Sequence, residues 1–409
     1  MNLKKELNEK SKVINSSDRD YIEQIKIGNN DFVFNKTTVK TFFVHNDDSR
    51  LYVFLSAIGI YRDAYPIFNR VSWHDKFNGI KFFFDDPSRL ELKFSPSFYF
   101  GNSKNNYLNY IKDIIEKTKR HFNIDNKDIT FISSSNGGFG CIYLANEFVG
   151  SRCIALCPQL DVKLYLGEQR FDEFKKRAEI IEEETDIEIY SRLNLYRIIN
   201  NNETKFIIFS NVACESDRLQ MNSFCSHINF NYKTGLNRIN DNFYLIVASM
   251  DNVDPHKVQP DENFCGYLSN YFWSDSEEQR FSIVSYFINS MYKANIENFK
   301  FRLMNSLFSI VPSYSKIHLV RQQNRDLDIY LNDDVYVRIS MIGNLIRPNV
   351  RFKKSIENLD LNKVYEYVKV SSCQMDESSI WVNIFGKPIS VDKYHEWFTH
   401  VNNYVGFLK

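Results

Sequence analysis

The chain has 409 residues, of which 43% are apolar and 25% are charged, and this composition excludes a globally disordered chain. Lysine plus arginine and aspartate plus glutamate both number 51, so the formal net charge is zero. Zero net charge argues against a general nucleic-acid binder, which would carry a basic excess.

Residues 1–30 are polar and are predicted to form an N-terminal extension, whereas residues 31–298 alternate short apolar runs with helical patterns. Several runs are apolar throughout, as expected for strands buried on both faces of a sheet. This alternation predicts an α/β-hydrolase-like fold with a mainly parallel sheet flanked by helices. The predicted strands are Lys40–His45, Leu51–Ser56, Ile80–Phe84, Ile129–Ser133, Cys153–Cys157, Lys205–Ser210 and Phe243–Ser249, and the predicted helices are Tyr107–Phe122, 137–148, 167–183, 216–228 and 277–294.

The pattern changes at about residue 299. Apolar and polar residues alternate from Leu327 to Leu331, turn-forming residues follow at 332–334, and alternation resumes from Val335 to Met341. This is the signature of a β-hairpin. Further strands are predicted at Lys363–Val370 and Ser379–Phe385, and a closing helix at Ser390–Phe407. We therefore predict a smaller β-rich accessory domain with a terminal helix over residues 299–409.

Cysteine usage and the polar start of the chain predict the compartment. The seven cysteines include no Cys-x-x-Cys pair, which favours reduced thiols in a cytoplasm over a secreted disulfide framework. The opening sequence, MNLKKELNEKSK, lacks the apolar core of a signal peptide. No apolar run reaches the roughly 18 residues that a membrane span needs. We therefore expect a cytoplasmic protein without a membrane span, and a homo-oligomer is left open.

The strongest local signal lies at residues 129–140, ITFISSSNGGFG, where an apolar strand enters a tight Ser/Gly turn that opens a helix. This is the context of a nucleophile elbow. The usual G-x-S-x-G pattern reads S-S-S-N-G, with the small Ser133 in the first glycine position and Ser135 as the predicted nucleophile. Ser133, Gly137 and Gly138 are small because strand and helix nearly touch there.

A phosphate-binding glycine-rich turn is the alternative for this segment, because a helix N-terminus also suits an anion. The segment lacks the lysine of a P-loop and the spacing of a Rossmann fingerprint. A plain Ser/Gly connection without chemistry is the third interpretation.

A nucleophilic serine needs an orienting acid and a base, which follow it in chain order in this fold. Asp217 follows the predicted strand Lys205–Ser210, and His256 follows Phe243–Ser249. Open α/β sheets place their sites beyond the carboxyl ends of strands. We therefore predict a triad of Ser135, Asp217 and His256. Helix capping remains open for Asp217, and His227 is the rival base, although it falls inside a predicted helix.

The oxyanion of an acyl-transfer intermediate needs two backbone N–H donors. The small residues after Leu51–Ser56 suit one donor, and the residue after the nucleophile supplies the other. We predict the amides of Ala57 and Asn136, with Ile58 as the substitute for Ala57.

A metal site is not expected. Asp251 and Asp254 precede His256 and could be ligands, but no second cluster supports a metal. Asp85-Asp86-Pro87 follows a predicted strand and is interpreted as a turn, with contact to an acceptor substrate as the alternative.

The segments FISSSNGGFGCIYLA, IALCPQLDV and VFLSAIG resemble α/β-hydrolase-fold O-acetyltransferases that modify bacterial capsular polysaccharides, a group related to glycoprotein acetyltransferases of the accessory Sec system. The resemblance covers roughly residues 40–260. It implies that Ser135 accepts the acyl group, that Asp217 is the acid and that His256 is the base. The sequence departs from the pattern at Ser133 and in the VDPH loop before the histidine.

The resemblance implies a serine O-acyltransferase that moves acetyl from acetyl-CoA, bound only as substrate, to a sugar hydroxyl of a polysaccharide or glycan. The alternatives are an esterase or deacetylase with the same triad, and a non-catalytic assembly or secretion factor on a hydrolase fold.

Overall fold

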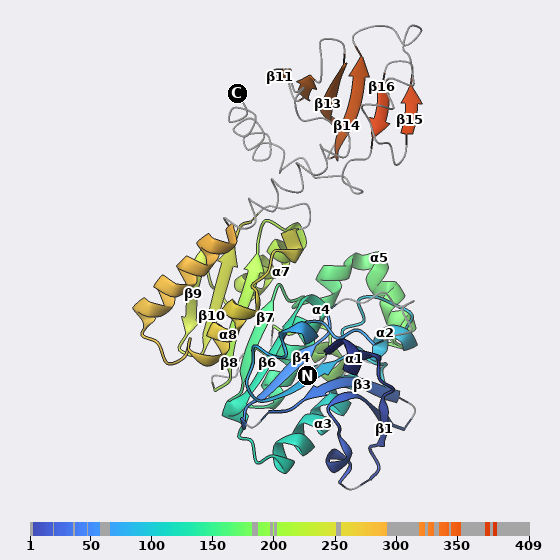
Figure 1. Cartoon of the computed structure of the whole chain (residues 1–409), viewed down its shortest axis with the longest axis vertical. Helices are drawn as coiled ribbons and strands as arrows, with labels where there is room; N and C mark the ends of the chain where they lie inside the picture. The colour runs from blue at the N-terminus through green and yellow to red at the C-terminus, as the bar shows by residue number, and fades with distance from the viewer. Residues whose placement is uncertain are drawn as a thin grey trace. The chain divides into compact units, whose positions relative to one another are not determined.

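The computed structural model describes residues 3–57 apart from 19, 36 and 47, then 66–181, 187–196, 199, 203–250 and 255–292, followed by the backbone of six strands (Figure 1). The chain divides into one unit of residues 1–250 and 254–292 and a second of residues 251–253 and 293–409. The sequence predicts a domain boundary at 298/299, whereas the structure divides after Tyr292.

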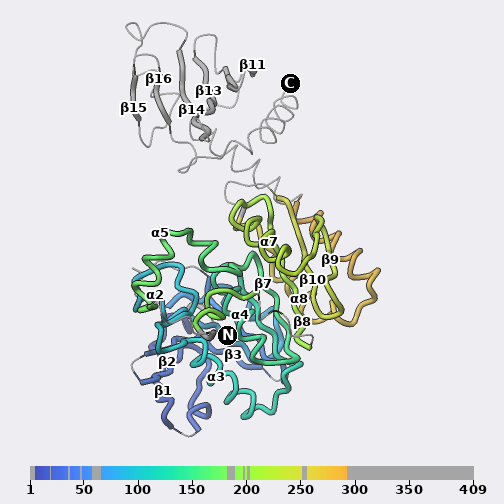
Figure 2. Tube along the Cα trace, turned by 180° about the vertical axis from the view of Figure 1, so that it is seen from behind, coloured from blue at the N-terminus to red at the C-terminus, as the bar shows by residue number. Residues whose placement is uncertain are grey.

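The first unit is built on a ten-stranded sheet in the order β1-β2-β3-β5-β4-β6-β7-β8-β10-β9. Pairs from β5 through β4, β6, β7 and β8 to β10 are parallel, whereas β3 pairs antiparallel with β2 and β5, and β9 pairs antiparallel with β10. Figure 2 follows the sheet from β1–β3 on one side to β10 and β9 on the other. The strands are β1 (Lys12–Asn15), β2 (Gly28–Phe34), β3 (Thr37–Val44), β4 (Leu51–Leu55), β5 (Ile80–Phe84), β6 (Ile129–Ser134), β7 (Arg152–Leu156), β8 (Lys205–Asn211), β9 (Gly235–Asn240) and β10 (Phe243–Ala248).

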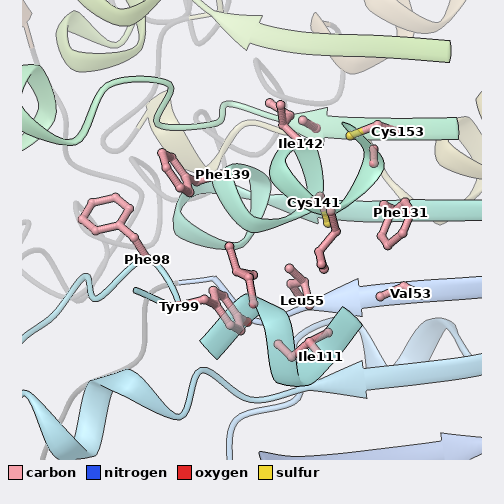
Figure 3. Close-up of a cluster of buried hydrophobic side chains, with 14 of the residues drawn as sticks. Val53, Leu55, Phe98, Tyr99, Ile111, Phe131, Phe139, Cys141, Ile142 and Cys153 are labelled. Carbon is pink, nitrogen blue, oxygen red and sulfur yellow. The ribbon is translucent and has the colours of Figure 1, made fainter. Parts of the chain in front are cut away.

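Helices cover both faces of this sheet, and each face has its own hydrophobic core. In β4, Val53 and Leu55 enter the core formed with α3, α4, α5 and α7, whereas Phe54 enters the core formed with α8 and the helix at residues 277–292. Figure 3 shows Leu55 beside Cys141 and Tyr99 in the first core. The labelled helices are α1 (Leu3–Asn8), α2 (Ser88–Glu91), α3 (Tyr107–His121), α4 (Ser135–Glu147), α5 (Val162–Arg177), α6 (Ile187–Ser191), α7 (Glu215–His227) and α8 (Glu262–Asn270), with short 3-10 helices η1 (Tyr21–Gln24), η2 (Val71–Trp73), η3 (Asn126–Asp128) and η4 (Pro255–Lys257).

The predicted fold is confirmed: a mainly parallel, α/β-hydrolase-like sheet is flanked by helices on both faces. Strands buried on both faces explain why the sequences of β4, β5, β6 and β10 are continuous apolar runs.

Side chains fix the first residues of several helices. Asn106 caps α3 by accepting from the Leu108 amide at 3.0 Å, and Asp261 caps α8 by accepting from the Phe264 amide at 2.9 Å.

Residues 1–30 differ from the expected polar extension. They contribute α1, β1 and η1, and β1 pairs in parallel with β2 over Lys12–Asn15. The buried side chains of Asn29 and Asn30 make this polar segment compatible with the sheet. The Asn29 side-chain amide donates to the carbonyl oxygens of Glu6, Leu7 and Glu9 at 2.9–3.1 Å, so its burial leaves no amide hydrogen unpaired.

The second unit contains a six-stranded antiparallel sheet in the order β11-β12-β13-β14-β16-β15. The predicted hairpin corresponds to the β12–β13 pair. The other predictions at Lys363–Val370, 383–385 and Ser390–Phe407 lie outside the described residues. The strands are β11 (Leu319–Gln323), β12 (Asp326–Tyr330), β13 (Val335–Ile342), β14 (Leu345–Phe352), β15 (Cys373–Asp376) and β16 (Ser379–Val382).

Candidate active site

Ser135 lies at the junction between β6 and α4, as the first residue of the helix, and is 4% exposed. Its φ of 54° places a residue with a side chain in the left-handed region, where backbone strain is concentrated at functional turns. This is the backbone geometry of a nucleophile elbow, in which the nucleophile projects from the carboxyl edge of the sheet.

The small residues around Ser135 allow the helix to approach the sheet. A Cβ on Gly137 would lie 2.7 Å from the carbonyl oxygens of Leu55 and Ser56 and would overlap Oγ of Ser133. A Cβ on Gly138 would lie 2.9 Å from Cβ of Pro158. The hydroxyl of Ser133 donates to the Leu55 carbonyl, which accounts for a serine at the first glycine position.

Gln159 follows β7 and is the nearest polar partner of the Ser135 hydroxyl. Its Nε2 donates to Oγ of Ser135 at 2.6 Å, and the side chain is 1% exposed. Oε1 of Gln159 is buried without a hydrogen-bond partner among the described residues. Sequence reasoning missed this residue, because Pro158-Gln159 reads as an ordinary loop after a strand.

The structure brings Asp217 and His256 together. Asp217 lies in the first turn of α7, after β8, and is 4% exposed, whereas His256 lies in η4, after β10. Nδ1 of His256 lies 2.8 Å from Oδ1 and 3.0 Å from Oδ2 of Asp217. A carboxylate on Nδ1 holds a histidine so that Nε2 can work as a base. Nε2 is buried and has no hydrogen-bond partner in the described residues.

Two cysteines flank this pair. Burial raises the pKa of the Cys157 thiol, and the Asp217 carboxylate adds to the increase through its charge and a hydrogen bond. Cys214 precedes α7, and its Sγ lies 3.2 Å from Oγ of Ser216. Burial lowers the pKa of His256, but the hydrogen bonds and charges of Asp217 and Cys214 outweigh burial and raise it from 6.5 to about 10.

The two predicted oxyanion donors, the amides of Ala57 and Asn136, differ in their surroundings. Asn136 is the second residue of α4, where backbone amides have no partner within the helix. The Ala57 amide donates to Oδ1 of Asn69 at 2.7 Å, so a substrate would have to compete with Asn69 for it. Ile58, the predicted substitute, lies outside the described residues.

Asp86, which the sequence predicts to lie in a turn, belongs to a buried polar cluster that includes Asn136 of the elbow. Asp86 accepts hydrogen bonds from the hydroxyl of Ser97 at 2.8 Å, from the amide of Tyr99 at 3.0 Å and from Nδ2 of Asn136 at 3.3 Å. Oδ1 of Asn136 accepts from the Phe98 amide at 2.6 Å. These contacts hold the Asn136 side chain in the protein interior.

His227, the rival base, lies apart from this cluster. His227 is the last residue of α7; it is exposed, and its ring packs 5.5 Å from that of Tyr196. Asp251 and Asp254 lie outside the described residues.

The carboxyl edge of four adjacent strands carries the predicted triad. Ser135 follows β6, Gln159 follows β7, Asp217 follows β8 and His256 follows β10. In the described residues no hydrogen bond joins Ser135 to His256, because Ser135 is paired with Gln159 and Nε2 of His256 is unpaired. Catalytic contacts of this kind often form only with substrate bound. The triad therefore stays a prediction.

Comparisons with known proteins give structural likeness only. No protein-family model matches the sequence, and no curated protein matches it. Both groups that the sequence resembles occur among similar solved structures. The capsule O-acetyltransferase of Neisseria meningitidis serogroup A is 15% identical with a TM-score of 0.42, covering 61% of this chain and 95% of that one.

Two further solved structures are similar to the same degree. The glycosylation-associated protein complex Gap123 of Streptococcus agalactiae is 16% identical with a TM-score of 0.39, covering 61% of this chain and 48% of that one. A fluorophosphonate-binding serine hydrolase of Staphylococcus aureus is 13% identical with a TM-score of 0.37, covering 58% of this chain and 93% of that one. Likeness at this level does not assign a function. Among the described residues, no helix is long and apolar enough to cross a membrane.

Proposed function

We propose that the protein is a serine-dependent O-acyltransferase that moves an acetyl group from acetyl-CoA to a hydroxyl of a bacterial polysaccharide or glycan, in the cytoplasm. The observation that carries the proposal is Ser135, held at φ 54° on the elbow between β6 and α4. The hydrogen-bonded Asp217–His256 pair at the same edge of the sheet supports it.

In the proposed first step, Nε2 of neutral His256 takes the proton of Ser135 as Oγ attacks the thioester carbonyl. The tetrahedral intermediate collapses, the carbon–sulfur bond breaks, and the thiolate of CoA takes the proton from the imidazolium. The acetyl group is then an ester on Ser135. A sugar hydroxyl next loses its proton to His256 and attacks this ester, and Ser135 recovers the proton as it leaves.

Gln159 is the proposed second oxyanion donor beside the Asn136 amide. Its Nε2 already lies 2.6 Å from Oγ of Ser135, and the carbonyl oxygen of an acyl-serine is only two bonds from Oγ. Esterification weakens Oγ as an acceptor, so the Gln159 amide becomes free for the developing negative charge. A buried side-chain amide can supply this stabilisation in place of a backbone donor, which matters here because Asn69 occupies the Ala57 amide.

The test is mass spectrometry of the protein mixed with acetyl-CoA. We expect one added acetyl group on Ser135, with none on the Ser135→Ala variant. Ser133→Ala is the matched control, since Ser133 lies two residues away and its hydroxyl is bonded to the Leu55 carbonyl. A fold-competent protein that neither takes the acetyl group nor reacts with a fluorophosphonate would contradict the proposal and favour a non-catalytic binding scaffold.

An esterase or deacetylase is the second candidate, because the same Ser135 and Asp217–His256 pair would transfer the acyl group to water in place of a sugar hydroxyl. The His256 side chain is 22% exposed, although its Nε2 is buried. The two activities differ in the fate of the acyl group. With glycan present, a transferase yields acetylated glycan, whereas an esterase yields free acetate at a rate independent of glycan. Measuring both products in one reaction separates them.

A further inference from the structure

Three side chains with metal-binding atoms converge beside the proposed triad. One ligand atom each from Cys157, Asp217 and His256 lies within 4.8 Å of the other two. The residues follow β7, β8 and β10, which are adjacent in the sheet. Cys157 is 1% exposed and Asp217 is 4% exposed, so the fold itself holds these two ligands in place.

Cys214 supplies a fourth candidate ligand on the same side of the sheet. It is the N-cap residue of α7, three residues before Asp217, and is partly exposed. Its Sγ is not among the atoms that lie within 4.8 Å of one another, so it has to move closer to coordinate the same ion. The cluster is therefore built into the protein on one side and reachable from the surface through Cys214 and His256.

The ligand types select one kind of cation. Magnesium and calcium prefer sets of oxygen ligands, whereas thiolate, imidazole and carboxylate together suit zinc. Tetrahedral zinc with bonds of about 2.0–2.3 Å requires ligand atoms about 3.3–3.8 Å apart. The three ligand atoms are separated by up to 4.8 Å, which exceeds this ligand–ligand distance by about 1 Å. The separation of 2.8 Å between His256 Nδ1 and Asp217 Oδ1 is shorter than this distance. Coordination therefore requires the three ligand atoms to move closer to a common centre and Asp217 to move away from Nδ1 of His256.

We propose that Cys157, Asp217 and His256, with Cys214 as the fourth ligand, form a binding site for zinc, and that zinc bound there inhibits the enzyme. Each coordinating thiol releases its proton to solvent as the metal–sulfur bond forms, so binding is a proton-releasing, non-redox step. Binding separates Asp217 from Nδ1 of His256 and removes the contact that would orient the base. The site itself does not depend on the proposed function; only the inhibition rests on it.

The binding test uses the full chain, a phosphine reductant and Co²⁺ as a spectroscopic substitute for zinc. We expect one equivalent of Co²⁺ to give a thiolate-to-cobalt charge-transfer band that added zinc abolishes. Cys157→Ser should lose the band and weaken zinc binding by more than about tenfold, and Cys214→Ser should reduce both. Cys225→Ser is the matched control, because Cys225 is a buried thiol elsewhere on α7. Thermal melts check that each variant is folded.

The Ser135→Ala variant separates this proposal from the proposed function. It should bind the metal as the unaltered protein does, although it has no acyl-transfer activity. Absence of the charge-transfer band, or a band that persists in both folded Cys157→Ser and Cys214→Ser proteins, overturns the site. For inhibition, each variant is compared with its own rate in a chelator. Zinc should inhibit the unaltered protein reversibly and Cys157→Ser far less, and equal inhibition of the two overturns the regulatory part.

Discussion

Replacing Gly137 with alanine tests the close approach of α4 to the sheet. The new Cβ would lie 2.7 Å from two backbone carbonyl oxygens, those of Leu55 and Ser56, and would overlap the hydroxyl of Ser133. The carbonyls belong to β4 and the residue after it, so they cannot rotate away as a side chain could. Overpacking of this kind costs about 1–3 kcal/mol, and we expect the upper end. Alanine recovers about 1 kcal/mol in helix propensity, so the expected net destabilisation is about 2 kcal/mol.

The matched control is Gly266→Ala in α8, where an added Cβ meets no atom within 4 Å. That variant gains helix propensity without a clash, so it should be more stable by about 1 kcal/mol. The two variants should therefore differ by about 3 kcal/mol in the free energy of unfolding, measured by urea denaturation. A second variant, Gly137→Ala with Ser133→Ala, should recover only part of the loss, because the carbonyl contacts remain. If Gly137→Ala were as stable as Gly266→Ala, the proposed packing of the elbow would be refuted.

Four predictions concern the chemistry, each measured in chelator by steady-state acyl transfer. Ser135→Ala should lower kcat by roughly 10⁴-fold or more, whereas Ser133→Ala should keep most activity, and the reverse pattern would mean that the elbow register is wrong. His256→Ala should match Ser135→Ala in severity, whereas His227→Ala should be nearly silent; an inactive His227→Ala beside an active His256→Ala would reassign the base. Gln159→Ala should lower kcat by about 10²–10³-fold, and an unchanged kcat would remove Gln159 from the oxyanion site. Because the pKa of His256 is raised to about 10 and the base must be neutral, kcat/KM should still be rising with pH above neutrality, and a plateau reached below pH 6.5 would contradict this.

The sequence predicts the central strands well, because strands buried on both faces read as apolar runs with sharp ends. Ile80–Phe84 is predicted with its observed bounds, and the strand before the elbow is predicted to within one residue. β1 and β2 were missed because their sequences, KVIN and GNNDFVF, contain polar residues. Asn29 and Asn30 are nevertheless buried, because they bond to nearby backbone carbonyls, and pairing of that kind is invisible in hydropathy.

The candidate site could be predicted only in part for a related reason. Asp217 and His256 are chemically conspicuous residues after strands, so chain order and strand ends suffice to propose them. Gln159 is not conspicuous: an amide side chain after a strand is common, and only the structure places its Nε2 on the Ser135 hydroxyl. The occupied Ala57 amide could not be foreseen either, because its partner Asn69 lies twelve residues further along the sequence.

The turn after β7 carries residues that contact both Ser135 and Asp217, and α7 holds this turn in place. Cys157 directly follows β7 with a φ of 46° and donates its amide to the Phe209 carbonyl of β8 at 2.6 Å, so the chain bends sharply where its thiol meets Asp217. Two residues later, Gln159 reaches Ser135. Gln220, one helical turn beyond Asp217 on α7, then accepts the amides of residues 160 and 161 at 2.8 Å each. Because one helix holds both the acid and this turn, a shift of α7 would move the partner of His256 and the partner of Ser135 together. Ser135 and His256 are thus positioned by a shared support, although no hydrogen bond joins them in the described residues.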